Sequence, residues 1–334
     1  MFGTFRFVLS MMVVYSHFTG RGLIGPVAVF GFYCLSGYLM TKVVNETYSD
    51  GVSGYLRFLS NRALRVYPGY YAAAAVAAAV LLVWPDAAQG TWYRFPLEWL
   101  PTVTIIGLQP RSPILVLPAW SLHVELIHYI LIGAVLGRSR LLTALWFVCA
   151  LAMPMVAILR GFSFDWLYFS PYGASAAFAS GAMVYQFRAQ LPAFTPLLAA
   201  VALCVLVCLG LKMPLEISAA GGLHFSILVT AAVIMGLKGL SAHRWDSVLG
   251  DLAYPVFLVH LPCRAAVHGL LDRSDIWADA AAIAATIAVS GLIFAFIERP
   301  LSRVRAKLRS PVPERLLARR ATITNHCAPI VAVH

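Results

Sequence analysis

Residues 24–44 read IGPVAVFGFYCLSGYLMTKVV, and Lys42 is the one charged side chain in this stretch. A transmembrane helix needs about 20 predominantly apolar residues, so these residues are long and apolar enough to cross a bilayer as one helix. Similar segments recur along the chain with short connections between them. The sequence therefore predicts an all-α, polytopic membrane helix bundle of about ten transmembrane helices. The expected spans are 4–19, 24–44, 67–84, 118–137, 141–160, 166–188, 192–211, 219–240, 249–271 and 276–297.

The composition leaves little room for a separate soluble domain. Of 334 residues, 60% are hydrophobic and 12% are charged, whereas a soluble domain carries about 25% charged residues. The formal net charge of +11 is better explained by membrane-orienting loops than by nucleic acid, so we expect membrane lipids and no nucleic acid as partners. The six cysteines include no Cys-x-x-Cys pair and indicate neither zinc nor a redox couple.

The charges of the loops predict the orientation of the bundle. With a cytoplasmic N-terminus, the loops on that side hold nine basic residues, whereas the opposite loops hold six basic and seven acidic residues. The positive-inside rule favours this arrangement, and ten spans return the C-terminus to the cytoplasm. We therefore expect a multi-pass membrane domain over 1–300 and a basic cytoplasmic tail over 301–334, suited to anionic headgroups. The segment 50–66 is expected to be an interfacial amphipathic helix.

Ionisable side chains inside spans are costly and point to function. Arg6 and His17 are separated by eleven residues, or about three helical turns plus 20°, so both emerge on one helix face about 16 Å apart. A ligand along that face could meet Arg6 with an anionic end and His17 with a reactive end. The plainer alternative is that Arg6 is an interfacial anchor and that His17 is a core histidine whose hydrogen bonds are satisfied.

Two arginines precede the third span. Arg62 and Arg65 stand at i and i+3 and point the same way. Their planar guanidinium groups suit phosphate better than lysine would. A purely topological role as positive-inside anchors is the alternative.

Two further groups lie within later spans. Glu125 has no basic neighbour in sequence, so it is either protonated or paired with another helix; a structural ion pair is the plain alternative. His123, Glu125 and His128 lack the two-histidine spacing of a zinc helix, so no metal is expected. His260 shares a helix face with Arg264 and is expected to line a cavity.

These clusters, taken in order, resemble the acyltransferase type 3 family of membrane O-acyltransferases. The motifs are Phe5-Arg6 with His17, Phe30 to Leu39, Arg62 to Arg65 leading to Pro68, Trp120-Ser121-Leu122-His123-Val124-Glu125, Tyr254 to His260, and Ile297-Glu298-Arg299-Pro300. The resemblance implies a ten-span bacterial inner-membrane protein. It also implies acetyl-CoA or another acyl-CoA as donor substrate, no permanently bound cofactor, and a glycan or other exported acceptor.

The resemblance also implies roles for single residues. His17 would be catalytic, as general base or as transient acyl acceptor, and Glu125 would orient it or stabilise its charged form. The acyl-CoA would bind to Arg6, Arg62 and Arg65. The acceptor path would be lined by Tyr33, Ser36, Trp120, Ser121 and His260. The chain departs from the family pattern at Asn61, where arginine is frequent, and at His123, where a small residue is usual.

The expected function is thus O-acyl transfer, with acetyl as the expected acyl group, to a cell-surface glycan or lipid-linked sugar, alongside the polysaccharide synthesis machinery. A proton-coupled transporter with His17 and Glu125 in its pathway is the alternative, because ten spans with intramembrane ionisable groups would also serve a carrier. A third alternative is a non-catalytic subunit that anchors a polysaccharide synthesis complex.

Overall fold

The computed structural model describes residues 2–20, 23–48, 51–85, 99–110, 114–161, 163–191, 196–212, 219–241 and 243–309. All regular structure within these residues is helical. The α-helices are α1 (Phe2–Thr19), α2 (Ile24–Glu46), α3 (Val52–Val83), α5 (Trp99–Thr104), α6 (Trp120–Leu131), α7 (Arg140–Leu159), α8 (Phe164–Phe169), α9 (Pro171–Gln186), α10 (Pro196–Lys212), α11 (Ala219–Leu237), α12 (Arg244–Leu271), α13 (Ile276–Ile293) and α14 (Arg299–Leu308). A 3-10 turn, η1 (Leu117–Ala119), precedes α6, and the π-helical turns η2 (Ile132–Leu136) and η3 (Phe294–Glu298) follow α6 and α13.

Each of the ten expected spans contains a helix, and two of the expected segments differ from the structure. The separate interfacial helix expected over 50–66 is the first half of α3, which runs on through Pro68. Membrane helices tolerate proline because neighbouring helices supply partners for freed backbone groups. Near Pro68, the Tyr254 hydroxyl on α12 donates to the Val66 carbonyl at 2.7 Å. The span expected over 166–188 is divided by the extended backbone of Ser170, whose side chain caps α9.

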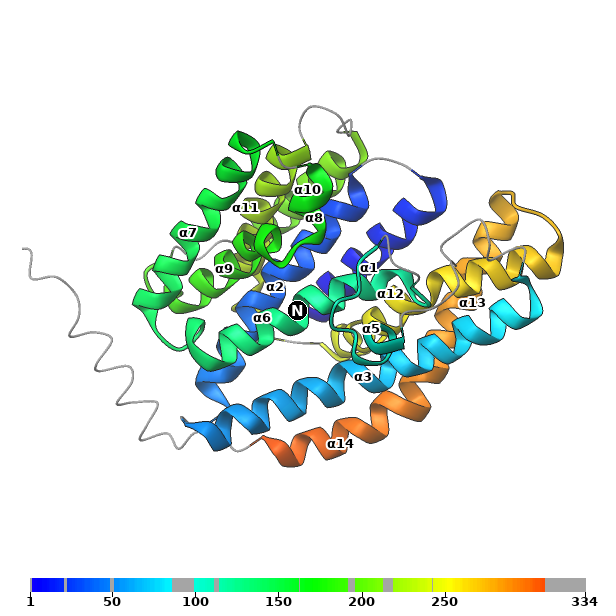
Figure 1. Ribbon diagram of the computed structural model, residues 1–334, viewed down its shortest axis with the longest axis horizontal. Helices are drawn as coiled ribbons and strands as arrows, with labels where there is room; N and C mark the ends of the chain where they lie inside the picture. The colour runs from blue at the N-terminus through cyan, green and yellow to red at the C-terminus, as the bar shows by residue number, and fades with distance from the viewer. Residues whose placement is uncertain are drawn as a thin grey trace, which may run out of the picture.

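The end of the expected membrane domain is helical. The expected boundary between 300 and 301 falls inside a helix, because α13 continues through η3 into α14, which packs beside α3 (Figure 1). The rest of the expected tail, 310–334, lies outside the described residues, as does most of the connection between α3 and α5.

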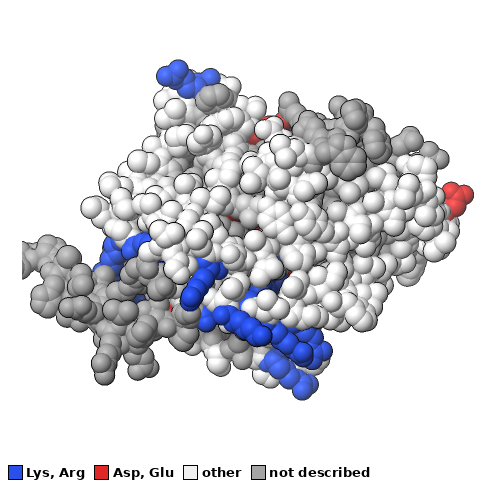
Figure 2. All heavy atoms as spheres, turned by 60° about the horizontal axis from the view of Figure 1, so that its bottom comes forward, with Lys and Arg blue, Asp and Glu red and all other residues white. Residues whose placement is uncertain are grey.

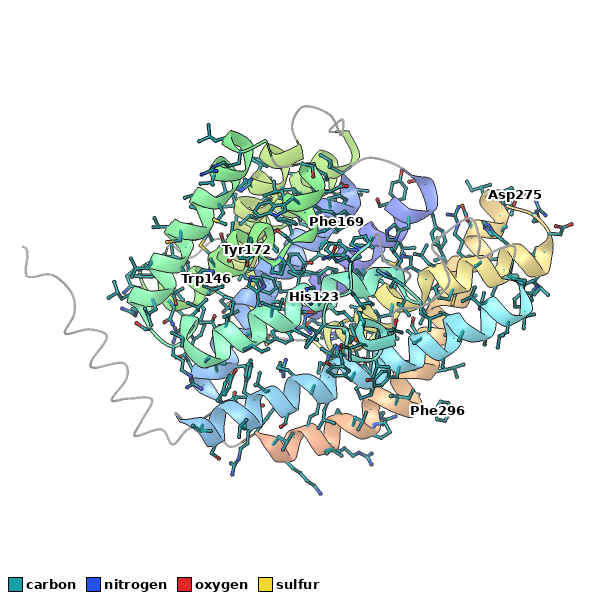
Figure 3. All side chains as sticks on the ribbon, viewed as in Figure 1. His123, Trp146, Phe169, Tyr172, Asp275 and Phe296 are labelled. Carbon is teal, nitrogen blue, oxygen red and sulfur yellow. The ribbon has the colours of Figure 1, made fainter. Side chains whose placement is uncertain are left out.

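The outer surface of the bundle is that of a membrane protein. Four helical stretches are long and apolar enough to cross a bilayer, namely Ile24–Glu46, Val52–Val83, Leu117–Leu136 and Ile276–Leu308, and shorter apolar helices accompany them. Large apolar side chains face outward, including Leu82 (85% exposed), Leu159 (78%) and Phe296 (76%), which points away from the ribbon in Figure 3. Lys and Arg gather on the side that lies at the bottom of Figure 1, near α14, and most of the face in Figure 2 is uncharged. Exposed apolar surface of this extent indicates burial in lipid.

Helix α2 lies at the centre of the bundle, between α9 and α1 (Figure 1). Glycines bring α2 and α9 into backbone contact. A Cβ atom on Gly37 would lie 2.0 Å from the Phe178 carbonyl oxygen, and one on Gly181 would lie 1.8 Å from that of Cys34. Small residues at such crossings let membrane helices approach closely and gain van der Waals contact.

Polar contacts and another glycine crossing join α1 to α12. A Cβ atom on Gly250 would lie 2.7 Å from the Cα of Gly3. Asp246 accepts from the Thr4 backbone N–H at 2.8 Å, and the Ser10 hydroxyl donates to the Ala253 carbonyl at 2.7 Å. These bonds satisfy polar groups that lipid could not solvate, and they fix α1 in register with α12.

The α2–α9 crossing makes a stability prediction. Gly181→Ala should lower the free energy of unfolding by about 3 kcal/mol, because the added methyl group has no room beside the α2 backbone and overpacking costs about 1–3 kcal/mol or more. The matched control is Gly291→Ala on α13, where a Cβ would meet no heavy atom within 4 Å. That change should stabilise the helix by about 0.5–1 kcal/mol. Thermal unfolding in detergent measures both, and equal melting temperatures would contradict the close crossing.

Candidate active site

A cavity of about 310 Å³ opens among α1, α2, α3, α6 and α12, next to the end of α14. We call it the arginine cavity. Its charged lining residues are five arginines and two acids, namely Arg6, Arg62, Arg65, Arg305, Arg309, Glu125 and Asp251. The excess of positive charge favours an anion over a cation in this cavity.

The arginines differ in how they are paired. Arg65 forms an ion pair with Glu298 and lies over the Tyr254 ring at 5.2 Å. Arg62 is 9% exposed and donates to the Asn61 amide oxygen at 2.7 Å, and its Nε is buried without a hydrogen-bond partner. Arg6 makes no hydrogen bond or ion pair to the described residues. Among the described residues, Arg65 is the one lining arginine with a carboxylate partner, which favours a ligand with several anionic oxygens.

Asn61 and α14 form part of the same site. The Asn61 side chain donates to the Arg305 carbonyl at 2.9 Å while it accepts from Arg62. It thus holds against α3 the helix that carries Arg305 to the cavity. Asn61, where arginine is frequent in the family, therefore makes the contact between α3 and α14.

Glu125 lies in the arginine cavity and away from the His17 ring. Its carboxylate accepts from the Ser36 hydroxyl at 2.5 Å and from the Tyr129 hydroxyl. The expectation that Glu125 orients His17 does not match this placement, since the side chain bonded to the His17 ring is His260. Glu125 instead ties α2 to α6 inside the cavity.

A second cavity, of about 190 Å³, contains His17. This histidine cavity has no charged side chain among the described residues that line it. Its walls are Val13, Ser16, His17, Gly25, Pro26, Val29, Pro110, Leu117, Pro118, Trp120, Tyr168, Phe169 and Phe257. The Trp120 and Phe169 rings meet edge to face at 4.7 Å, and Phe169 lies at the end of α8 in Figure 3.

His123, also labelled in Figure 3, supports the wall of the histidine cavity rather than its chemistry. Its Nδ1 accepts from the backbone N–H of Gly107 at 3.1 Å. Gly107 has φ +88°, a conformation that favours glycine. The bond anchors the loop that carries Pro110 into the wall, and this accounts for a histidine at a position where small residues are usual.

The two cavities lie end to end along the same helices. On α1, Arg6 lines the arginine cavity and His17 the histidine cavity. On α2, the lining residues follow one face at helical spacing. Gly25, Pro26 and Val29 face the histidine cavity, and Val29, Phe32, Tyr33, Ser36, Leu39, Met40 and Val43 face the arginine cavity. An elongated ligand could thus reach from the arginines to His17, as the spacing of Arg6 and His17 predicts.

The His17 ring is held by His260. The two rings stack with centroids 5.0 Å apart, and His17 Nδ1 lies 2.7 Å from His260 Nε2. The other nitrogen of His260 lies 3.2 Å from the Val256 carbonyl, which can only accept a hydrogen bond. His260 Nδ1 therefore donates, its Nε2 accepts, and His17 Nδ1 carries the shared proton. This assignment leaves His17 Nε2 with a free lone pair.

Arg264 fixes the end of helix α1 at His17. Its guanidinium group donates to the carbonyls of His17 at 3.0 Å and Phe18 at 2.9 Å. It also forms an ion pair with Asp279 on α13 at 2.8 Å, and His268 joins the same carboxylate at 2.9 Å. The last carbonyls of a helix lack intrahelical partners and favour a cation, so Arg264 holds the backbone of His17 in place.

The structure brings the ten expected site residues into three groups. The arginine cavity takes Arg6, Tyr33, Ser36, Arg62, Arg65, Ser121 and Glu125, the histidine cavity takes His17 and Trp120, and His260 lies buried behind His17. Sequence reasoning missed Tyr129, Phe257, Arg305 and Arg309. Tyr129 stands four residues after Glu125 and could have been found from that spacing.

One known protein family matches most of the chain. A family described as an acyltransferase domain matches residues 3–296, from α1 to η3. The chain belongs to the acyltransferase type 3 family. It is accordingly a membrane acyltransferase, and the match includes the parts of α1, α2, α3, α6 and α12 that line both cavities. Neither curated proteins nor solved structures give a match to the chain.

The Arg65–Glu298 pair makes a second stability prediction. Glu298→Gln should destabilise the protein by about 3 kcal/mol, because losing one partner of a buried pair leaves the other charge uncompensated. The control is Glu46→Gln, which breaks the exposed Lys42–Glu46 pair and should cost less than about 1 kcal/mol. Thermal unfolding in detergent compares the two variants. Similar losses of stability would show that the Arg65–Glu298 pair stabilises the protein no more than the exposed pair does.

Proposed function

We propose that the protein transfers an acyl group from acyl-CoA to a hydroxyl group of a cell-surface or exported glycan, with acetyl as the preferred acyl group. It would do so in the bacterial inner membrane, with both termini in the cytoplasm. The end-to-end arrangement of the arginine and histidine cavities carries this proposal. A lipid-linked sugar handed over by the polysaccharide synthesis machinery would be an acceptor of the required kind.

The arginine cavity suits the donor. Coenzyme A carries phosphates at one end and a thioester at the end of a long flexible arm. Arg6 and Arg62 lack carboxylate partners and would bind the phosphates. The arm would then follow the lining face of α2, past Tyr33 and Ser36, towards His17. In this arrangement Tyr33, Ser36 and Ser121 contact the donor rather than the acceptor path expected for them.

His17 Nε2 supports either of two routes. As a general base it takes the proton of the acceptor hydroxyl while the hydroxyl oxygen bonds to the thioester carbonyl carbon. The carbon–sulfur bond then breaks, and the CoA thiolate leaves and takes the proton. As a nucleophile, Nε2 bonds to the carbonyl carbon first, the carbon–sulfur bond breaks and CoA leaves as thiolate. The acceptor hydroxyl oxygen then bonds to the acyl carbon, the carbon–nitrogen bond to His17 breaks, and the hydroxyl proton passes to the CoA thiolate. Both routes need the same lone pair, and His260 acts as a positioning residue for it.

The histidine cavity suits an acceptor that presents a hydroxyl beside an apolar face. Trp120, Tyr168 and Phe169 line it, and aromatic rings pack well against the C–H face of a sugar ring. Trp120 keeps its expected role at the acceptor. Comparison of the host's surface glycan by mass spectrometry, with and without the protein, identifies the acceptor.

Donor binding is tested with acetyl-CoA and the purified protein. Acetyl-CoA should raise the melting temperature, because a ligand that binds only the folded state stabilises it. Arg62→Ala should weaken binding about tenfold or more, since a hydrogen bond to a charged group contributes about 1.5–3 kcal/mol. Arg57→Ala, on the exposed face of the same helix, should leave binding unchanged. No stabilisation of the wild type by acetyl-CoA would remove the proposal.

The His17–His260 pair is tested by activity. His17→Ala should reduce acetyl transfer by about 10²–10⁴-fold while acetyl-CoA still binds. His260→Leu should also reduce transfer, by about tenfold or more, because the His17 tautomer is no longer fixed. His260→Gln keeps an acceptor oxygen near the position of Nε2 and should recover most of that loss. Full activity in His17→Ala, or equal activity of the two His260 variants, contradicts these roles.

A further inference from the structure

Val29 and Phe257 are the two residues that line both cavities, among the parts of the chain that the structure describes. Both are nearly buried, at 4% and 8% exposed. Val29 lies on α2 between the residues that face His17 and those that face the arginines. Phe257 is the last α12 residue along the arginine cavity. The two side chains therefore form the junction between the cavities.

The junction has little freedom to change shape. The Phe257 ring meets the Phe32 ring at 5.7 Å and an angle of 63°, the edge-to-face arrangement that aromatic pairs prefer. Val29 is β-branched and lies within a helix, where valine has one strongly preferred rotamer. The packing of these two side chains therefore sets the width of the passage.

A donor bound by the arginines has to cross this junction to reach His17. Arg6, Arg62, Arg65, Arg305 and Arg309 line the cavity on one side, and His17 lines the cavity on the other. A donor with its phosphates among the arginines must present its acyl group to His17 between Val29 and Phe257. The end of the arm next to the thioester is unbranched and a two-carbon acyl group is narrow, whereas an acyl group branched next to the carbonyl is wider.

We infer that Phe257, together with Val29, selects the acyl group by its width, admitting acetyl and excluding acyl groups branched beside the thioester. This inference rests on the proposed acyl-CoA donor and adds the determinant of donor choice. One methylene in an apolar pocket typically changes selectivity by about 10–200-fold. We therefore expect the wild type to prefer acetyl over isobutyryl by at least about tenfold.

An internal competition tests the inference. Membranes that contain the protein and its native acceptor receive equal amounts of acetyl-CoA and isobutyryl-CoA, and mass spectrometry gives the ratio of the two esters formed. Phe257→Ala should lower the preference for acetyl by about tenfold or more, and Phe257→Leu and Val29→Ala should lower it less. Leu39→Ala, a truncation that lines only the arginine cavity, should keep the wild-type ratio.

The outcomes separate this inference from the proposed function. If the wild type forms both esters equally, or if the junction variants keep the wild-type ratio, the inference is overturned and acyl transfer stands. If the wild type forms neither ester and binds neither acyl-CoA, the proposed function fails with it. Phe257→Leu and Val29→Ala carry the test if Phe257→Ala does not fold.

Discussion

A guanidinium group removed from water must find an anion or enough hydrogen-bond acceptors, and in an apolar bundle this requirement shapes the whole site. Arg65 forms an ion pair with Glu298. Arg264 forms an ion pair with Asp279 and donates hydrogen bonds to two helix carbonyls. Arg62 and Arg6 find no carboxylate, so their charge remains available to a ligand. The difference between these two sets of arginines divides the structure into parts that hold the fold and parts that receive a substrate.

Sequence reasoning succeeded where the signal is local. The apolar segments predicted the helices because each segment carries its own hydrophobicity, and Arg62 and Arg65 were predicted to share a face because helical spacing is fixed. The same argument placed Arg6 and His17 along one face of α1, and both line cavities there.

The remaining errors and omissions come from contacts between residues far apart in the chain. His17 and His260 are separated by 243 residues, and neither sequence neighbourhood predicts that the two rings meet. The charge of its segment predicts a basic tail for Arg305, whereas the structure places Arg305 on α14 beside the arginine cavity. The half-buried face formed by Leu301, Arg305 and Leu308 follows helical spacing and could have indicated a packed helix.

The contacts between α1 and α12 run the full length of α1, from Thr4 with Asp246 to His17 with His260 and Arg264. Helices α2 and α9 are locked in the same way by Gly37 and Gly181. Each pair is therefore best regarded as one rigid body. Phe257 belongs to the first body and Val29 to the second, so the junction lies on the seam between them. Its aperture can change only if the two bodies slide or tilt against each other, and such a movement leaves His17 and its proton partner undisturbed.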